Sequence, residues 1–369
     1  MRLGYTIAAL TVVAGAALSS AVQAQTLPQV VAASRGTIFQ VGQFASALAT
    51  INGGFFNQNN AFVSSPGAQT PDQFGAGIWV RATGGTFDTS VTGVLSGPVP
   101  STSARVRTFS DYSGLQASAD VARYNLGDSG YTMHLGVTGG QVNIRSTGPD
   151  APGEARFAVP FVGGYMAITG HGFFFDALVR GDFFELSTGG NGFRFNTTAI
   201  TGATSIGYRI DLPDFYIVPS AAFSYTSLEG GSQPTAAAGP ILPGTISLRT
   251  ITSELGRINL TVGKDVQVGD FVLSPFVTAS VFNEFAAPAS ITFNGAAVVA
   301  GPAVVPLVLN GTLSRVGTYG QFSIGSSMAT NVSAPGGKEA NLLGFVRADF
   351  RVGDHADGYG VSGGLRYQF

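Results

Sequence analysis

The chain of 369 residues is apolar and weakly charged: 44% of its residues are hydrophobic, 11% are charged, and the net charge is −2. A soluble globular protein would carry about 25% charged residues, and a near-neutral chain without charge runs has nothing to attract nucleic acid or an anionic membrane surface. The lack of cysteine excludes a disulfide framework, a thiolate metal site and a lipid-modified cysteine.

The first residues have the pattern of an export signal. Arg2 supplies a positive charge, and the apolar core from Ile7 to Leu18 is shorter than the ~18 residues that a membrane helix needs. Val22 and Ala24 place aliphatic and small side chains at positions −3 and −1 of a cleavage site before Gln25. We therefore expect residues 1–24 to be a cleaved signal peptide.

Residues 25–74 have a helical pattern that the rest of the mature chain lacks. Between Ile38 and Ile51, apolar side chains recur at three- and four-residue spacing, which predicts an amphipathic helix. A Pro- and Gly-containing linker comes next, with Asn59-Asn60 at its start. We expect this helix to lie inside the domain formed by residues 75–369, in a central channel that we call the lumen. There its polar side chains would contact Arg81, Asp182, Arg347 and Asp349.

Residues 75–369 consist of amphipathic segments of strand period, separated by turn-rich stretches. Every second residue is apolar, and no apolar run is long enough for a membrane helix. The pattern predicts an all-β fold, a twelve-stranded antiparallel transmembrane β-barrel. The expected strands are Gly77–Gly85, Thr108–Tyr124, Tyr131–Arg145, Arg156–Ile168, Phe173–Ser187, Phe195–Ile210, Phe215–Ser227, Ile246–Lys264, Phe271–Phe285, Leu313–Met328, Leu342–Arg351 and Gly358–Phe369.

The connections alternate between tight turns and longer stretches. Residues 125–130, 169–172 and 211–214 are rich in Gly, Asp, Asn and Pro and predict tight turns. The stretches from Phe87 to Arg107 and from Ala286 to Asn310 are much longer. Outer-membrane barrels have short periplasmic turns and long external loops, so the pattern also predicts the orientation.

Charged residues fall on the inward parity of these strands. An Arg or Lys on the lipid face would cost roughly 2–4 kcal/mol at mid-bilayer. We therefore expect a lumen lined by charges of both signs. The lumen-facing set is Arg81, Asp120, Asp176, Arg180, Asp182, Arg209, Arg257, Arg347, Asp349, Arg351 and Arg366.

The last strand ends on alternating apolar side chains and an aromatic carboxy-terminus. This ending resembles the closing-strand signal read by the barrel-assembly machinery of Gram-negative outer membranes. The residues that carry it are Ser362, Gly364, Leu365, Tyr367 and Phe369. We expect the barrel-assembly machinery and periplasmic chaperones as partners during biogenesis, and outer-membrane lipid around a monomeric barrel.

The chain resembles the autotransporter β-domain family. The resemblance covers residues 75–369 and rests on Gly77-Ile78-Trp79-Val80-Arg81-Ala82, Ala119-Asp120-Val121-Ala122-Arg123-Tyr124, Leu343-Gly344-Phe345-Val346-Arg347-Ala348-Asp349 and Leu365-Arg366-Tyr367-Gln368-Phe369. It implies a translocator barrel in a Gram-negative outer membrane, a helix threading the lumen, and a passenger domain outside the cell. Residues 25–74 are too few for a β-helix passenger, which needs several repeats of ~20–30 residues. We expect little or no passenger.

Two other functions remain open from the sequence. A barrel of this width could be a pore for small solutes, and the apolar stretch from Ala286 to Asn310 could mediate adhesion at the cell surface. No enzymatic activity, cofactor or metal site is expected. His171 and His355 fall at opposite ends of the barrel, and the inward His134 beside Asp120 is explained by polar packing in the lumen as readily as by catalysis.

Overall fold

The computed structural model describes residues 42–56, 70–97, 101–149, 153–188, 194–235, 242–298, 304–333 and 339–369. The expected signal peptide (residues 1–24), the start of the expected helix before residue 42, and the Asn59-Asn60 pair lie outside the described residues. No helical segment in the described ranges has both the length and the apolarity to cross a membrane.

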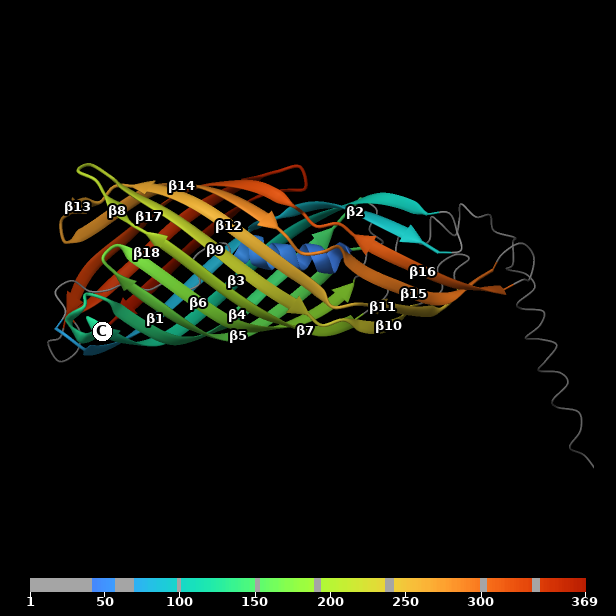
Figure 1. Ribbon diagram of the computed structural model, residues 1–369, viewed down its shortest axis with the longest axis horizontal. Helices are drawn as coiled ribbons and strands as arrows, with labels where there is room; N and C mark the ends of the chain where they lie inside the picture. Colours follow the sequence, from blue (N-terminus) through green and yellow to red (C-terminus); the bar gives the residue numbers. More distant parts are fainter. Residues whose placement is uncertain are drawn as a thin grey trace, which may run out of the picture.

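Twelve antiparallel strands close into a barrel (Figure 1), which confirms the predicted fold class. Each strand pairs with the next along the chain, and β1 closes the barrel on β19, with Gly77 opposite Gln368 and Gly85 opposite Gly360. The barrel strands are β1 (Gln73–Thr86), β3 (Thr102–Tyr124), β4 (Thr132–Thr147), β5 (Ala155–Gly170), β6 (Phe173–Thr188), β7 (Arg194–Tyr208), β9 (Tyr216–Leu228), β12 (Ile251–Gly263), β14 (Phe271–Glu284), β17 (Thr318–Ser333), β18 (Glu339–Val352) and β19 (Ala356–Gln368).

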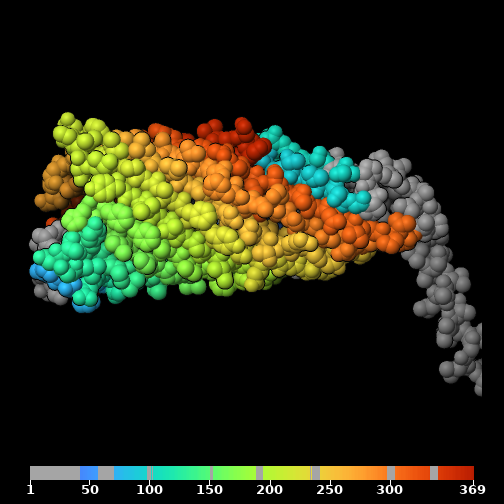
Figure 2. Space-filling model, in the orientation of Figure 1, coloured from blue at the N-terminus to red at the C-terminus, as the bar shows by residue number. Residues whose placement is uncertain are grey.

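Five further strands extend the wall beyond one end of the barrel. β2, β15 and most of β16 fall in the stretches that were expected to be long connections, whereas β11 includes the start of the expected strand Ile246–Lys264, which continues as β12 after residues 249–250. The five strands pair in the order β10, β11, β15, β16, β2. Figure 2 shows β15 and β16 in orange at this end of the elongated molecule. The bounds are β2 (Asp88–Ser96), β10 (Gly231–Thr235), β11 (Gly244–Leu248), β15 (Ala289–Val298) and β16 (Val304–Leu313).

The opposite end carries the tight turns. The 3-10 turn η2 (Leu126–Asp128) joins β3 to β4, and the short strands β8 (Ile210–Asp211) and β13 (Val266–Val268) prolong two hairpins there. His171 and Asn125 adopt positive φ angles of 52° and 44°, which such turns require. We call the two ends of the barrel the tight-turn end and the extended end.

A helix lies inside the barrel (Figure 1). It is α-helical over residues 42–49 and continues as the π-helix η1 (Thr50–Phe55). Its described span ends four residues later than the predicted one, because Asn52, Gly53, Gly54 and Phe55 continue it as π-helix. We call residues 42–55 the lumenal helix.

Candidate functional site: the barrel lumen

The lumenal helix is enclosed by apolar side chains of the barrel wall. Phe44, Leu48, Ile51 and Phe55 are all buried and lie on one face of the helix, and the buried Ala45 and Ala47 flank this face on either side. The Phe44 ring packs edge-on against Phe157 and Phe195, with centroids 5.5 and 5.2 Å apart. A helix that is apolar over this face and both of its flanks is stable in such an enclosure and not on a surface.

Three polar side chains of the helix are satisfied by hydroxyl groups of the wall and by the helix itself. Asn52 Nδ2 donates to Thr226 Oγ1 at 3.1 Å and to Ser253 Oγ at 3.3 Å. Ser46 Oγ lies 3.4 Å from Ser110 Oγ, while Thr50 Oγ1 donates to the Ser46 carbonyl at 2.8 Å. A buried amide or hydroxyl without a partner would be costly, so these contacts fix the depth and rotation of the helix.

A charged layer lies next to the C-terminal end of the helix. The Gly54 carbonyl accepts hydrogen bonds from Arg351 Nη2 at 3.5 Å and from the Tyr112 hydroxyl at 3.4 Å, and Arg180 Cζ lies 3.6 Å from the Phe56 ring centroid. Cations are favourable near a helix C-terminus because of its partial negative charge. The inward-facing residues of this layer are Arg81, Arg180, Arg257, Arg347, Arg351, Asp176, Asp182 and Asp349.

Ion pairs neutralise most of this layer. Arg180 donates to Asp182 through Nε at 2.5 Å and Nη2 at 3.0 Å, and Arg347 Nε donates to Asp349 at 2.6 Å. Arg257 forms no hydrogen bond or ion pair with a described residue, and its Cζ lies 5.8 Å from the Phe282 ring centroid. The layer holds more arginines than aspartates, so the partial negative charge at the C-terminal end of the helix helps to balance the excess positive charge of the layer.

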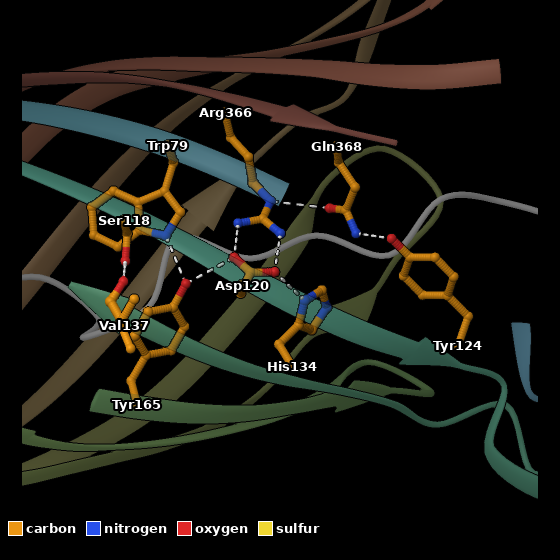
Figure 3. A network of polar contacts seen from close by, with 9 residues as sticks. All are labelled: Trp79, Ser118, Asp120, Tyr124, His134, Val137, Tyr165, Arg366 and Gln368. Carbon is orange, nitrogen blue, oxygen red and sulfur yellow. Dashed lines mark hydrogen bonds and ion pairs between the residues drawn. The ribbon is translucent and has the colours of Figure 1, made fainter. Parts of the chain in front are cut away.

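A second polar network lies nearer the tight-turn end (Figure 3). Asp120 binds the Arg366 guanidinium through two hydrogen bonds of 2.7 Å. The Tyr165 hydroxyl donates at 2.8 Å to Asp120 Oδ2, which also accepts from Arg366, and it accepts from Trp79 Nε1 at 3.0 Å. Arg366 Nε also donates to Gln368 Oε1 at 3.0 Å, and the Gln368 amide donates to the Tyr124 hydroxyl. The network joins β1, β3, β4, β5 and β19 from the inside.

The network contains the His134–Asp120 pair, with His134 Nδ1 3.0 Å from Asp120 Oδ1. Both side chains are fully buried, and both carboxylate oxygens already accept from Arg366. A general base must be within reach of a substrate proton, and this carboxylate faces only other protein groups. The arrangement is therefore suited to holding strands together. Within the described ranges, no three His, Asp or Glu side chains gather in a way that could hold a metal ion.

Nine of the eleven charged residues that the sequence places on inward parities are buried, Arg347 is half-buried beside Asp349, and Arg209 is exposed. Arg209 lies beyond the end of β7, and its side chain is 36% exposed. It pairs with Asp211 at 2.7 Å and Asp265 at 2.6 Å at the tight-turn end, and lies over the Tyr216 ring. Strand parity predicts facing only where the strand continues, so the lumenal assignment of Arg209 was wrong.

The lumenal helix also contacts different groups from those expected. Its polar side chains contact wall hydroxyls, while Asp182, Arg347 and Asp349 bind mainly one another and their neighbours in the wall. Arg81 donates to Gln116.

The residues of the expected assembly signal alternate between the two faces of the terminal strand. Ser362 is buried, whereas Leu365 and Phe369 are both 54% exposed on the outer surface.

The apolar half of the lumen was not predicted from the sequence. Towards the extended end, inward positions are apolar and form one buried cluster around the helix. The sequence did contain a sign of this cluster. In the halves of β4, β5 and β6 nearest the extended end, the inward-facing positions hold large apolar residues. They include Val142, Ile144, Phe157, Val159, Phe184 and Leu186.

Comparison with known proteins identifies relatives of the barrel. The sequence profile of the family described as autotransporter beta-domain matches residues 78–337. The probable autotransporter YcgV of Escherichia coli K12 is 24% identical over 304 residues, covering 79% of this chain and 27% of that protein. The chain therefore spans about a quarter of the length of this curated relative.

Solved structures of low sequence identity share the fold. The transport unit of AIDA-I from Escherichia coli has a TM-score of 0.55 at 13% identity and covers 88% of this chain and 98% of its own. The β-domain of BrkA from Bordetella has a TM-score of 0.52 at 19% identity, covering 79% and 98%. The translocator domain of NalP from Neisseria meningitidis has a TM-score of 0.50 at 12% identity, covering 90% and 99%.

Proposed function

The chain belongs to the autotransporter β-domain family, and from this premise we propose that its lumenal helix keeps the barrel closed after assembly. Membership of this family implies the outer membrane of a Gram-negative bacterium as its location and a translocator, not an enzyme, as its class. The observation that carries the proposal is the fit of the lumenal helix, which is buried against the wall along its described length. This fit favours a closed barrel over a small-solute pore.

The proposal extends to biogenesis. We infer that a signal peptide directs export, that the barrel-assembly machinery recognises the terminal strand, and that the barrel carries little or no passenger. The alternation of Leu365, Tyr367 and Phe369 on the lipid side supports recognition of an aromatic, apolar strand face. Surface adhesion is a second candidate, which is favoured by the exposed Val304 and Val308 on the extension of the wall.

Planar-bilayer conductance tests closure by the helix. The full chain should give small or flickering currents, and deletion of residues 42–56 should give a large, stable conductance, because a twelve-strand barrel is wider than the ~8-strand size that side chains alone can fill. Equal conductance of the two proteins would contradict the proposal.

A reversible lock provides the matched control. Because the chain has no cysteine, Ser46→Cys and Ser110→Cys would be its only thiols, on two side chains whose oxygens lie 3.4 Å apart. The disulfide should form in intact membranes. In planar-bilayer recordings the oxidised protein should keep a small conductance under conditions in which the reduced protein shows large openings. Failure to cross-link in membranes would place the helix elsewhere.

A further inference from the structure

Three arginines lie in one line on the outer wall near the extended end. Cα pairing runs from Asp111 of β3 to Arg145 of β4, Arg156 of β5, Ser187 of β6 and Arg194 of β7. All five side chains are exposed while their immediate neighbours within the strands are mostly buried, so they point away from the lumen. We call these five residues the arginine row.

The arginines of the row are poorly neutralised. Among described residues, Arg145 and Arg194 form no ion pair, and Arg156 pairs only with Glu154 across an exposed contact. Arg145 stands directly opposite Arg156, and like charges at directly opposed positions repel. Asp111 stands opposite Arg145 on its other side without an ion pair between them, and Glu185 also forms none with the arginines, so their guanidinium groups are available to an anion placed between β4 and β5.

The height of the row above the apolar belt indicates what could reach it. Below the row, outward positions change from Ser113 to the apolar Leu115 in β3 and from Glu185 to Phe183 in β6, while β4 stays polar at Asn143 and Gln141. Leu115 is four residues below Asp111, which at about 3.3 Å per residue and about 40° of tilt places the row about 10 Å above the apolar belt. A phospholipid headgroup layer is only about 5–7 Å thick, so a larger headgroup matches this height better.

We propose that Arg145, Arg156 and Arg194 bind the phosphate groups of a sugar-based lipid headgroup in the outer leaflet. Planar guanidinium groups bind phosphate through two parallel hydrogen bonds, and Arg145 and Arg156 stand opposite each other on adjacent strands, where one headgroup can bridge them. The proposal requires that the extended end face the outer leaflet, as expected for a barrel whose tight turns are periplasmic and whose long connections are external, and it does not depend on closure by the lumenal helix.

The test measures binding of fluorescent lipopolysaccharide to the purified full chain in detergent micelles. The variant Arg145→Gln/Arg156→Gln should bind about 30-fold more weakly, from the contribution expected of two basic residues near an anionic surface. The control Arg249→Gln/Lys264→Gln removes the same charge from exposed positions outside the row and should bind like the wild type. Heat-modifiable migration on gels confirms that each variant is folded.

Three outcomes would overturn the proposal. The first is equal binding by the row variant and the control. The second is undiminished wild-type binding after the lipopolysaccharide has been enzymatically dephosphorylated, which would assign the affinity to acyl chains or sugars. The third is arginine-dependent binding of phosphatidylglycerol as tight as that of lipopolysaccharide, which would make an ordinary phospholipid the ligand.

Discussion

Gly77 lies directly below the Arg366 guanidinium: a β-carbon at position 77 would stand 2.7 Å from Arg366 Cζ and nearer still to Nη2. Gly77 pairs with Gln368 on one side and with Asp120 on the other, so it occupies the middle of the path from β19 to β3. The missing side chain lets Arg366 cross β1 and reach Asp120. The seam between the first and last strands is thereby fastened to a third strand from inside.

The first prediction concerns this crossing. Gly77→Ala should displace Arg366 and weaken its two bonds to Asp120, lowering the unfolding midpoint in urea. The matched control is Gly202→Ala, another glycine within a barrel strand, where a β-carbon meets nothing within 4 Å. That substitution should be neutral or stabilise by up to about 1 kcal/mol, because alanine loses less backbone entropy than glycine. Equal effects of both substitutions would show that the crossing is not constrained.

The second prediction concerns the buried charge pair. Asp120→Asn should destabilise the barrel by about 3–5 kcal/mol, because it leaves the Arg366 charge buried without a counter-ion. Glu154→Gln removes the partner of Arg156 in an exposed pair and should cost less than about 1 kcal/mol. Urea unfolding of both variants in the same lipid measures the difference. Similar losses would mean that the network contributes no more than a surface pair.

The strand pattern predicted the barrel because successive side chains of a β-strand point to opposite faces of the sheet. A charged side chain on the lipid face is costly, so charged residues keep to the positions that face the lumen. The structure buries nine of the eleven charged residues assigned to the lumen by parity, including Asp120 on β3 and Arg366 on β19. Parity could not show that these two meet, since they are 246 positions apart and bond across an intervening strand. That contact depends on closure of the barrel, which is a property of the whole chain.

The extended end was less predictable for a different reason. The stretch from Ala286 to Asn310 is apolar and nearly uncharged, which is compatible with an external loop or with strands. It forms β15 and most of β16, because its apolar residues Ile291, Phe293 and Leu309 pack into the cluster around the lumenal helix. Without the helix in place, the sequence offers no core for them.

The third prediction is a pH dependence at the tight-turn end. The backbone N–H of Gly127 and the guanidinium of Arg123 each lie 3.0 Å from the Asp72 carboxylate and hold its pKa below the ordinary value of 3.8. A lowered folded-state pKa stabilises the protein fully above the unfolded pKa, and this stabilisation is lost as pH falls through the lowered folded-state pKa. Asp72→Asn should therefore lower the urea midpoint at pH 6, and the difference from the wild type should shrink as the pH falls below 3.8. A difference that grows towards low pH would contradict this assignment.

The fourth prediction separates recognition of the terminal strand from stability. Phe369→Ala keeps the backbone bonds of 2.8 and 2.9 Å between Phe369 and Ala76, and removes a ring that is 54% exposed. Phe350→Ala removes a ring of the same exposure from β18. The two variants should be about equally stable once assembled, but Phe369→Ala should yield less membrane-inserted protein and more periplasmic degradation. Equal yields would argue against recognition of the terminal aromatic.

The fifth prediction tests how the lumenal helix is seated. A β-carbon at Gly53 would collide with the Tyr319 hydroxyl and approach Phe87 Cζ to 3.2 Å. The Tyr319 ring cannot move easily, because it stacks on Phe282 with centroids 4.7 Å apart and planes 6° apart. Gly53→Ala should therefore unseat the end of the helix, and planar-bilayer recordings should show longer and larger openings than those of the wild type.

Tyr319→Phe provides the internal control for this substitution. The Tyr319 hydroxyl is buried and has no hydrogen-bond partner among the described residues, so its removal alone should be neutral or stabilising. In Gly53→Ala/Tyr319→Phe the new methyl group gains the space of the lost oxygen, and the closed state should be largely restored. The double-mutant cycle then gives a favourable coupling between the two positions. Additive effects would mean that the helix opens for a reason other than this contact, because only a steric conflict between these two groups predicts rescue.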